Sequence, residues 1–104
     1  MKLVLAVVAA FKLDEIKQVL HALGTHGMTV TEVSRWSRRV AGEDKLIPCV
    51  KLEIVVHDDR ADRVVAEILR AARNGHPVDG QILVTRVDEA RGIRTGTIDE
   101  AAIA

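Results

Sequence analysis

The sequence predicts one α+β domain of four strands and two helices, and three observations support this class. An apolar run rich in β-branched residues fills positions 2–9, as in a strand buried on both faces. Two later segments carry apolar residues at helical spacing. Two segments, 28–36 and 49–57, alternate between apolar and polar residues, as half-buried strands do. A fourth strand is expected at 81–87, after a turn. A chain of 104 residues accommodates one domain, so we expect a single domain over residues 1–104.

The first strand has a competing interpretation as a secretion signal, because Lys2 precedes the apolar run 3–11. That run is far too short to span a bilayer. It also leads directly into an amphipathic helix. A buried strand therefore explains it better.

Both predicted helices have recognisable ends. The apolar stripe of the first helix comprises Leu13, Ile16, Val19, Leu20 and Leu23. Gly24 and Gly27 end this helix and permit the turn that follows. The stripe of the second helix comprises Ala61, Val64, Val65, Ile68, Leu69 and Ala72. Asp58 and Asp59 are candidate N-cap residues at its beginning, and Asn74-Gly75 favours its end.

Three segments lack periodicity and predict connections. Residues 37–47 are rich in arginine, glycine and acidic residues and form a loop, after which Pro48 introduces the third strand. Residues 76–80 form a turn before the fourth strand. The polar segment 88–104 forms a C-terminal tail.

The order strand–helix–strand–strand–helix–strand is that of a ferredoxin-like sandwich, a four-stranded antiparallel sheet with both helices on one face. The other sheet face is then uncovered, although it also carries apolar residues. Self-association is the simplest way to bury it, and we expect a homo-oligomer.

Composition excludes several classes of function. Fifteen basic residues balance fifteen acidic ones, so no net charge attracts nucleic acid or an anionic membrane. The aromatic residues are Phe11 and Trp36 alone, too few for a base-stacking surface. Trp36 could pack against a neighbouring subunit or contact a partner protein, and we expect packing, because large aromatic side chains generally supply buried area. The single cysteine, Cys49, cannot form an internal disulfide, which favours the reducing cytoplasm.

Five segments resemble the PII signal-transduction family in the order in which that family has them. They are Phe-Lys-Leu-Asp-Glu-Ile-Lys at 11–17, Gly-Met-Thr-Val-Thr-Glu-Val at 27–33, Val-Lys-Leu-Glu-Ile-Val-Val at 50–56, Asp-Gly-Gln-Ile-Leu-Val at 79–84 and Ile-Arg-Thr-Gly at 93–96. The resemblance implies a cytoplasmic homotrimer that is not an enzyme and that binds ATP, ADP or AMP in clefts between subunits. It further implies that a loop between the second and third strands, the T-loop, controls a partner protein such as a transporter or an enzyme of nitrogen or carbon metabolism.

The resemblance also implies the nucleotide-binding residues. Thr29 and Val55 would contact adenine, and the remaining positions would surround the phosphates. These positions are Ser37, Arg38, Asp79, Gly80, Gln81 and Arg94. A glycine permits close approach of the backbone to a phosphate, and arginines neutralise it with paired hydrogen bonds.

Departures from the family pattern change the expected ligands. The loop at 37–47 is short, and the chain has no tyrosine that could be uridylylated. Gln81 and Cys49 stand where the family has lysines, and Arg39 stands where it has a glutamine. We therefore expect weakened nucleotide binding and no binding of 2-oxoglutarate. Gly92 replaces one tail arginine, and whether Arg91 substitutes for it stays open. Arg35 and Ser37 replace two glycines.

Two alternatives stay open. The first is a PII-like trimer whose nucleotide site has degenerated and that senses another anion or acts through partner binding only. The second is a CutA-like metal-binding trimer, suggested by Cys49 and four histidines, His21, His26, His57 and His76. Their spacing matches no common metal motif, so we expect no permanent metal. Cys49 and His57 are also too far apart along one strand to form a catalytic pair.

Overall fold

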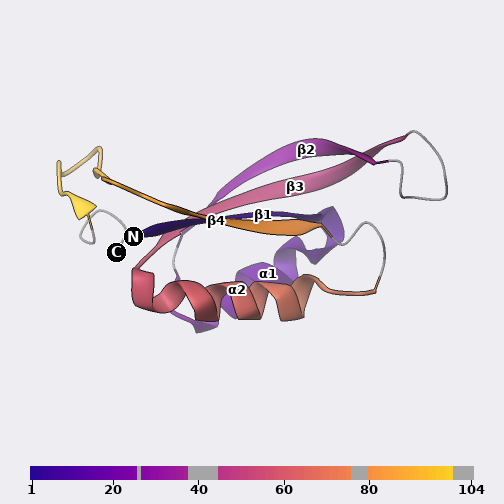
Figure 1. Ribbon diagram of the computed structural model, residues 1–104, viewed down its shortest axis with the longest axis horizontal. Helices are drawn as coiled ribbons and strands as arrows, with labels where there is room; N and C mark the ends of the chain where they lie inside the picture. Colours follow the sequence, from indigo (N-terminus) through magenta and orange to yellow (C-terminus); the bar gives the residue numbers. More distant parts are fainter. Residues whose placement is uncertain (26, 38–44, 76–79, 100–104) are drawn as a thin grey trace.

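The computed structural model describes residues 1–25, 27–37, 45–75 and 80–99 and confirms the predicted element order (Figure 1). The elements are β1 (Lys2–Ala9), the short 3-10 helix η1 (Ala10–Lys12), α1 (Leu13–Ala22), β2 (Thr29–Ser37), β3 (Lys45–Val56), α2 (Asp58–Ala72) and β4 (Gln81–Arg86). The 3-10 turn between β1 and α1 was not predicted. The other elements match their predicted segments to within a few residues.

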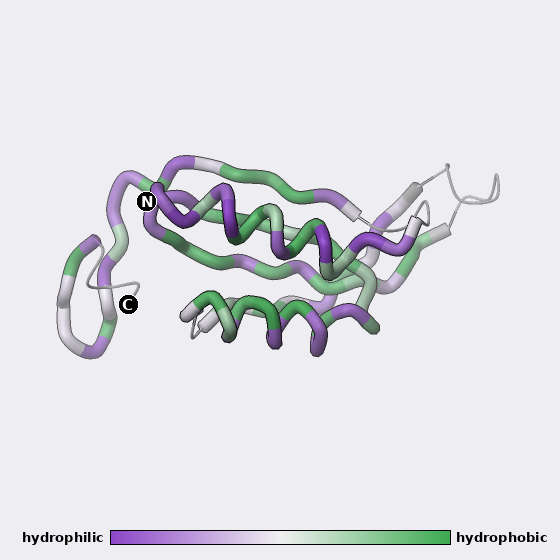
Figure 2. The backbone as a smooth tube through the Cα atoms, turned by 90° about the horizontal axis from the view of Figure 1, so that it is seen from below, coloured by the Kyte–Doolittle hydropathy of each residue, from purple (hydrophilic) through white to green (hydrophobic). Residues whose placement is uncertain are grey.

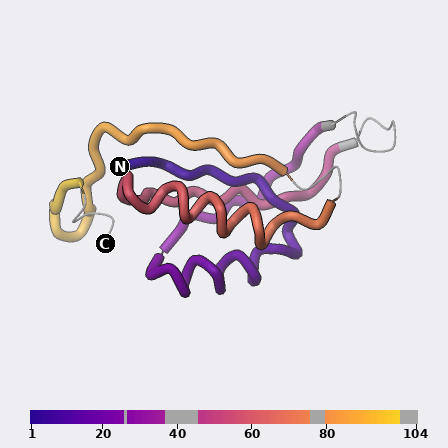
Figure 3. Tube along the Cα trace, turned by 60° about the horizontal axis from the view of Figure 1, so that its bottom comes forward, coloured from indigo at the N-terminus to yellow at the C-terminus, as the bar shows by residue number. Residues whose placement is uncertain are grey.

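The four strands form one antiparallel sheet in the order β2-β3-β1-β4. Helices α1 and α2 lie side by side on one face of this sheet (Figures 1 and 3). The arrangement is the predicted ferredoxin-like sandwich. The other face of the sheet, which we call the outer face, carries no helix in the part of the chain that the structure describes.

The core lies between the helices and the inner face of the sheet. Alternate residues of β1 point inward, and Val4, Ala6 and Val8 are at most 1% exposed. Their neighbours in β3 and the helices complete one continuous cluster. It includes Ile16, Leu20, Val50, Leu52, Ile54, Val56, Ala61, Val64, Ile68, Ala71 and Ala72. Figure 2 shows the matching pattern, with hydrophobic stretches along the strands and alternating hydropathy along the helices.

Local backbone chemistry fixes the ends of both helices. Gly24 adopts a positive φ of 85°, and the N–H of Thr25 donates to the carbonyl of Leu20 across this turn. Asp58 and Asp59 are not the N-cap residues of α2, because His57 holds that position; they occupy the first turn, where acidic side chains complement the helix dipole. The Arg60 guanidinium donates to the Leu23 carbonyl at 2.8 Å and joins the beginning of α2 to the end of α1.

The connection between β2 and β3 is shorter than the predicted loop at 37–47. The two strands pair from Thr29↔Glu53 to Ser37↔Lys45, which leaves only residues 38–44 between them. Pro48 lies inside β3 rather than introducing it. Strand β1 ends at the Ala9↔Cys49 pair, so Pro48 has a strand partner on one side only, and a residue without an N–H is tolerated there.

Part of the predicted tail folds back on itself. Arg91 and Ile98 form an antiparallel bridge, and the N–H of Gly92 donates to the Thr97 carbonyl at 2.8 Å. A second bond joins the Gly96 N–H to the Gly92 carbonyl at 2.9 Å. The described tail is therefore a compact hairpin rather than an irregular segment.

Candidate nucleotide site

The predicted adenine contacts lie together on the outer face of the sheet. Thr29 begins β2 and pairs with Glu53 of β3, and Val55 lies two residues further along β3 on the same face. Thr29 is exposed and Val55 is half-buried. The threonine hydroxyl, the neighbouring backbone and the apolar valine can contact the edge and face of a purine.

The same face carries a charged pair that sequence reasoning did not assign to the site. Glu53 pairs directly with Thr29, and its carboxylate lies 3.7 Å from the Lys51 ammonium. Both side chains are about one-third exposed, at 34% and 35%. Strand periodicity was the available signal, because residues 51, 53 and 55 must share one face.

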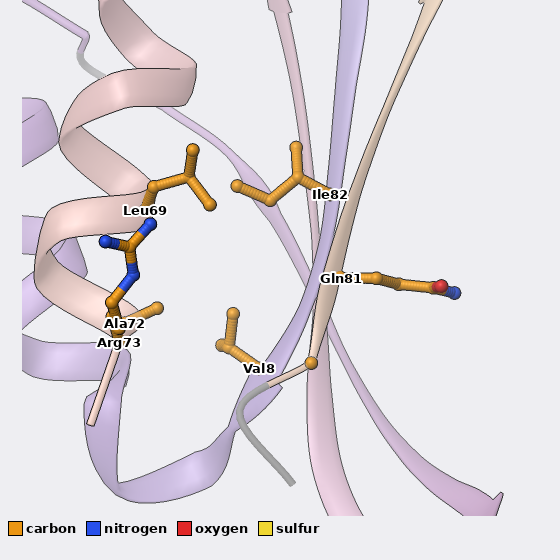
Figure 4. A pocket seen from close by; sticks show the side chains of 7 residues that line it. Val8, Leu69, Ala72, Arg73, Gln81 and Ile82 are labelled. Carbon is orange, nitrogen blue, oxygen red and sulfur yellow. The ribbon is translucent and has the colours of Figure 1, made fainter. Parts of the chain in front are cut away.

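The predicted phosphate turn enters the sheet at the opposite edge. Gly80 has a φ of 106°, and a Cβ at this position would lie 1.7 Å from the Val7 carbonyl oxygen. Glycine is therefore required here for packing against β1, whatever ligand approaches the turn. Gln81 pairs with Val7 and is exposed. Its side chain points away from Val8 and Ile82, toward the outer face (Figure 4).

Within one chain, the adenine contacts and the phosphate turn lie apart on the sheet. The register places Gln81, Val7, Lys51 and Thr31 in one row across four strands. At about 4.8 Å between neighbouring strands, Gln81 lies about 14 Å from Thr31. The adenine contacts and the phosphate turn thus occupy opposite edges of the outer face.

The cavity beside the phosphate turn is on the wrong side of the sheet for this ligand. It has a volume of about 170 Å³ and lies between the end of α2 and the strands (Figure 4). Its lining comprises Val8, Leu69, Ala72, Arg73, Gly80, Gln81 and Ile82. Small-molecule sites usually have volumes of about 300–1,000 Å³. This mainly apolar cavity is too small for a nucleotide.

The predicted tail residue lies outside the sheet. Strand β4 leaves the sheet where Arg86 pairs with Lys2, at the opposite end from the β2–β3 connection (Figure 1). Arg94 lies beyond that end, in the tail hairpin, and its side chain is exposed. No hydrogen bond or ion pair joins Arg94 to another residue of the described chain. Its guanidinium is available to a ligand or to another subunit.

Arg91 and Gly92 lie at the beginning of the tail hairpin. The Arg91 guanidinium pairs with the Glu89 carboxylate at 3.1 Å, outside the turn that holds Arg94. A Cβ at Gly92 would lie 2.9 Å from the Thr97 hydroxyl oxygen. The hairpin is therefore packed around a glycine at this position.

The remaining predicted contacts are described in part or not at all. Ser37 is the last residue of β2, next to the connection. Arg38 and Asp79 lie outside the described residues, as does Arg39. Cys49 is buried in β3 and forms no disulfide.

The described residues do not favour metal binding. Across residues 1–25, 27–37, 45–75 and 80–99, no three histidine, cysteine, aspartate or glutamate side chains cluster as metal ligands would. His26 and His76 lie outside these ranges. In the same part of the chain, every helix is too short or too polar to cross a membrane.

Comparisons with known proteins agree with the sequence resemblance. The family model "Nitrogen regulatory protein P-II" matches residues 1–97. Nitrogen regulatory protein P-II 2 of Methanothermobacter thermautotrophicus is 41% identical, with 99% of this chain and 97% of the relative aligned. Nitrogen regulatory protein P-II of Rhizobium etli is 38% identical, and nitrogen regulatory protein GlnK of Escherichia coli K12 is 34% identical, each over 99% of this chain and 100% of the relative.

These alignments run over 112 positions, whereas the chain has 104 residues. This chain therefore lacks residues that its relatives have, in agreement with a shortened connection. The match covers both helices, all four strands and most of the tail hairpin. The chain belongs to the nitrogen regulatory protein P-II family of signal-transduction regulators.

Proposed function

We propose that this protein is a trimeric regulator that binds an adenine nucleotide between subunits and controls a partner protein through residues 37–47. The observation that carries the proposal is the family match over residues 1–97, which includes all eight proposed nucleotide contacts. The protein acts in the cytoplasm and is not an enzyme. Its buried, unpaired Cys49 is compatible with a reducing compartment.

Assembly of subunits explains why one chain leaves the site incomplete. The outer sheet face holds Leu3, Leu5, Val7, Val55 and Leu83, and none of them is fully buried in the isolated subunit. Association of three such faces would remove this apolar surface from water. It would also allow Arg94 of one subunit to approach the sheet of another.

Changes around the phosphates predict weak discrimination among nucleotides. Gln81 and Cys49 stand where the family has lysines, so two fewer cations face the phosphates. Each well-formed charged contact is worth about 1.5–3 kcal/mol. The protein therefore prefers ATP over ADP or AMP less than its relatives do.

The same changes argue against 2-oxoglutarate as a ligand. Cys49 is 4% exposed and packed into β3, so its thiol is not presented to a carboxylate. Arg39 carries only hydrogen-bond donors and cannot ligate the Mg²⁺ that would bridge ATP and the dicarboxylate. Calorimetric titration of 2-oxoglutarate with Mg-ATP tests this, beside an Arg39→Gln, Cys49→Lys double variant. Saturable micromolar binding to the wild type would contradict it, and binding to the double variant alone would support it.

The main experiment is calorimetric titration with ATP, ADP and AMP, beside fluorescence of Trp36. This residue is the only tryptophan and precedes the β2–β3 connection, so its emission reports on ligands at the loop. Arg94→Ala should raise the Kd about tenfold or more. Arg63→Ala, which removes an exposed cation from α2, is the matched control and should leave the Kd unchanged.

Mixed trimers test whether the cleft lies between subunits. Gln81→Glu places a negative charge at the phosphate turn, and Arg94→Ala removes the cation of the tail. Each variant trimer alone should bind nucleotide weakly. Trimers reassembled from both variants should recover tight binding in a fraction of their clefts, because some clefts then combine two intact contributions. Absence of recovery would place Gln81 and Arg94 in one subunit's site.

The two alternatives predict different results. A degenerate site predicts no heat with any adenine nucleotide, although the trimer and its partner contacts remain. A CutA-like metal-binding trimer predicts stoichiometric metal in the purified protein, which elemental analysis would detect.

A further inference from the structure

A groove on the helix side of the sheet lies apart from the candidate nucleotide site. It has a volume of about 530 Å³ and runs between α1 and the beginning of β2. Its lining comprises Lys17, Leu20, His21, Thr25, Gly27, Met28 and Val30. The size falls within the range of small-molecule sites, about 300–1,000 Å³.

The groove exists because the helices do not cover the edge strand completely. Ala6, Leu52 and Val30 lie in one row on the inner face of β1, β3 and β2. Ala6 and Leu52 are 0% exposed, whereas Val30 is 42% exposed. Burial therefore falls sharply between β3 and β2, and the apolar side chain at the edge remains accessible.

The floor of the groove is apolar. Leu20 is 2% exposed and belongs to the core, and Met28 packs against the core from the connection before β2. Val30 continues this surface on the strand. Together they offer a surface from which an apolar ligand would displace water.

The rim of the groove carries nitrogen donors on α1. Lys17 and His21 are four residues apart and so lie one above the other on the helix surface. The Lys17 ammonium is 3.3 Å from the Asp14 carboxylate, and these side chains are 55% and 89% exposed. Ion pairs at this exposure are weak, and an ammonium has three donors, so Lys17 can bind a second carboxylate.

We propose that this groove binds a small amphipathic carboxylate. The apolar tail lies on Leu20, Met28 and Val30, and the carboxylate pairs with the Lys17 ammonium, beside His21 on the rim. The site is on the opposite face of the sheet from Thr29 and Val55. It is therefore a site distinct from the nucleotide site proposed above, although Met28 and Val30 flank Thr29 along the chain.

The test is titration of ¹⁵N-labelled protein with octanoate, octanol and octylamine, followed by amide chemical shifts. Octanoate should shift the amides of Leu20, Met28 and Val30 saturably, with a Kd of about 1 mM, as a small ligand in an open groove allows. Octanol lacks the charge and should bind more weakly. Octylamine should bind weakest, because its ammonium faces Lys17.

Two variants test separately how the apolar floor and the polar rim of the groove contribute to octanoate binding. Val30→Trp fills the groove and should abolish the saturable shifts. Lys17→Gln, His21→Gln should weaken octanoate about tenfold and remove its advantage over octanol. Arg63→Gln is the matched control on α2 and should change neither. Thermal unfolding of each variant shows whether the fold is intact.

Absence of saturable shifts in the wild type at millimolar octanoate would overturn the proposal. So would equal binding of octanoate and octylamine, or shifts that survive Val30→Trp in a folded protein. Calorimetry with ATP on the same samples distinguishes this failure from that of the proposed function. Octanoate should not compete with ATP, and Arg94→Ala should leave octanoate binding unchanged.

Discussion

The two faces of the sheet carry similar side chains but are covered to very different extents. Val8 on the inner face is 1% exposed, whereas Leu83 on the outer face is 49% exposed. Over the central strands β1 and β3, the inner face is buried by α1 and α2 within one chain. The outer face has no such cover among the described residues, and association with another chain would bury it. The comparison separates residues that hold the subunit together from residues that are free to form contacts between subunits.

The strongest test of the difference between the two faces uses two adjacent valines, Val7 on the outer face and Val8 on the inner face. Val8→Asp buries an unpaired carboxylate in the core, which costs several kcal/mol and should unfold the subunit. Val7→Asp places the same charge on the outer face, where Lys51 is its strand neighbour. This variant should keep its circular dichroism spectrum but have the mass of a monomer by light scattering.

If Val7→Asp unfolds the chain at every concentration, the outer face belongs to the subunit core and the comparison fails. Val7→Thr is the control for side-chain shape, and it should leave both the fold and the assembly in place.

The second prediction sharpens the comparison at the edge of β4. Gly80→Ala combines a positive φ with a Cβ 1.7 Å from the Val7 carbonyl oxygen, so β4 must shift away from β1. We expect a loss of about 1–3 kcal/mol or more in the free energy of unfolding, measured in urea. Gly75→Ala is the matched control. Gly75 also has a positive φ, of 76°, but no atom lies within 4 Å of its added Cβ.

Gly75→Ala should therefore cost only the backbone term, about 1 kcal/mol. Equal losses in the two variants would show that the approach of β4 to β1 adds nothing to the requirement for glycine at position 80.

The third prediction concerns the junction of the two helices beneath the inner face. Arg60→Ala removes the hydrogen bond to the Leu23 carbonyl, and we expect a loss of about 1 kcal/mol in the free energy of unfolding. Arg63→Ala, one turn away on the same helix, should change stability by less than about 0.5 kcal/mol. Amide exchange should increase at Leu23 and Gly24 in the first variant but not in the second.

The regular part of the fold could be predicted from periodicity, because alternation in the strands and the stripes of both helices record which face is buried. The end of β2 and the beginning of β3 could not be predicted in this way. Ser37 and Lys45 show no hydrophobic alternation. They pair because they continue a register that begins at Thr29 and Glu53. The tail hairpin was missed for a similar reason, since its bonds join backbone groups of Gly92 and Thr97 that no side-chain pattern encodes.

The candidate site was predictable in its residue types but not in its layout. Resemblance assigned Thr29, Val55, Gly80 and Arg94 individually. Their separation over opposite edges and ends of the sheet depends on register and strand order, which the motifs do not specify. The structural need for Gly80 against Val7 was also invisible, because Asp-Gly is an ordinary turn signal in any sequence.

The smallest predicted effect is electrostatic and lies where α2 meets the beginning of β1. The ammonium group of Met1 is 2.9 Å from the Asp58 carboxylate and lowers the pKa of Asp58 below its ordinary value of 3.8, with smaller contributions from Lys2 and Arg86. A pKa that is lower in the folded than in the unfolded state stabilises the fold above the unfolded value. This stabilisation is lost as the pH falls through the pKa of the folded state.

Asp58→Asn should therefore lower the urea midpoint slightly at neutral pH and not at strongly acidic pH, where Asp58 is protonated in both states. Other carboxylates titrate in both proteins, so the informative quantity is the difference between wild type and variant. Because Asp58 is exposed, high salt should reduce that difference. A difference that stays constant from neutral to strongly acidic pH would assign the role of Asp58 to its shape at the helix start rather than to its charge.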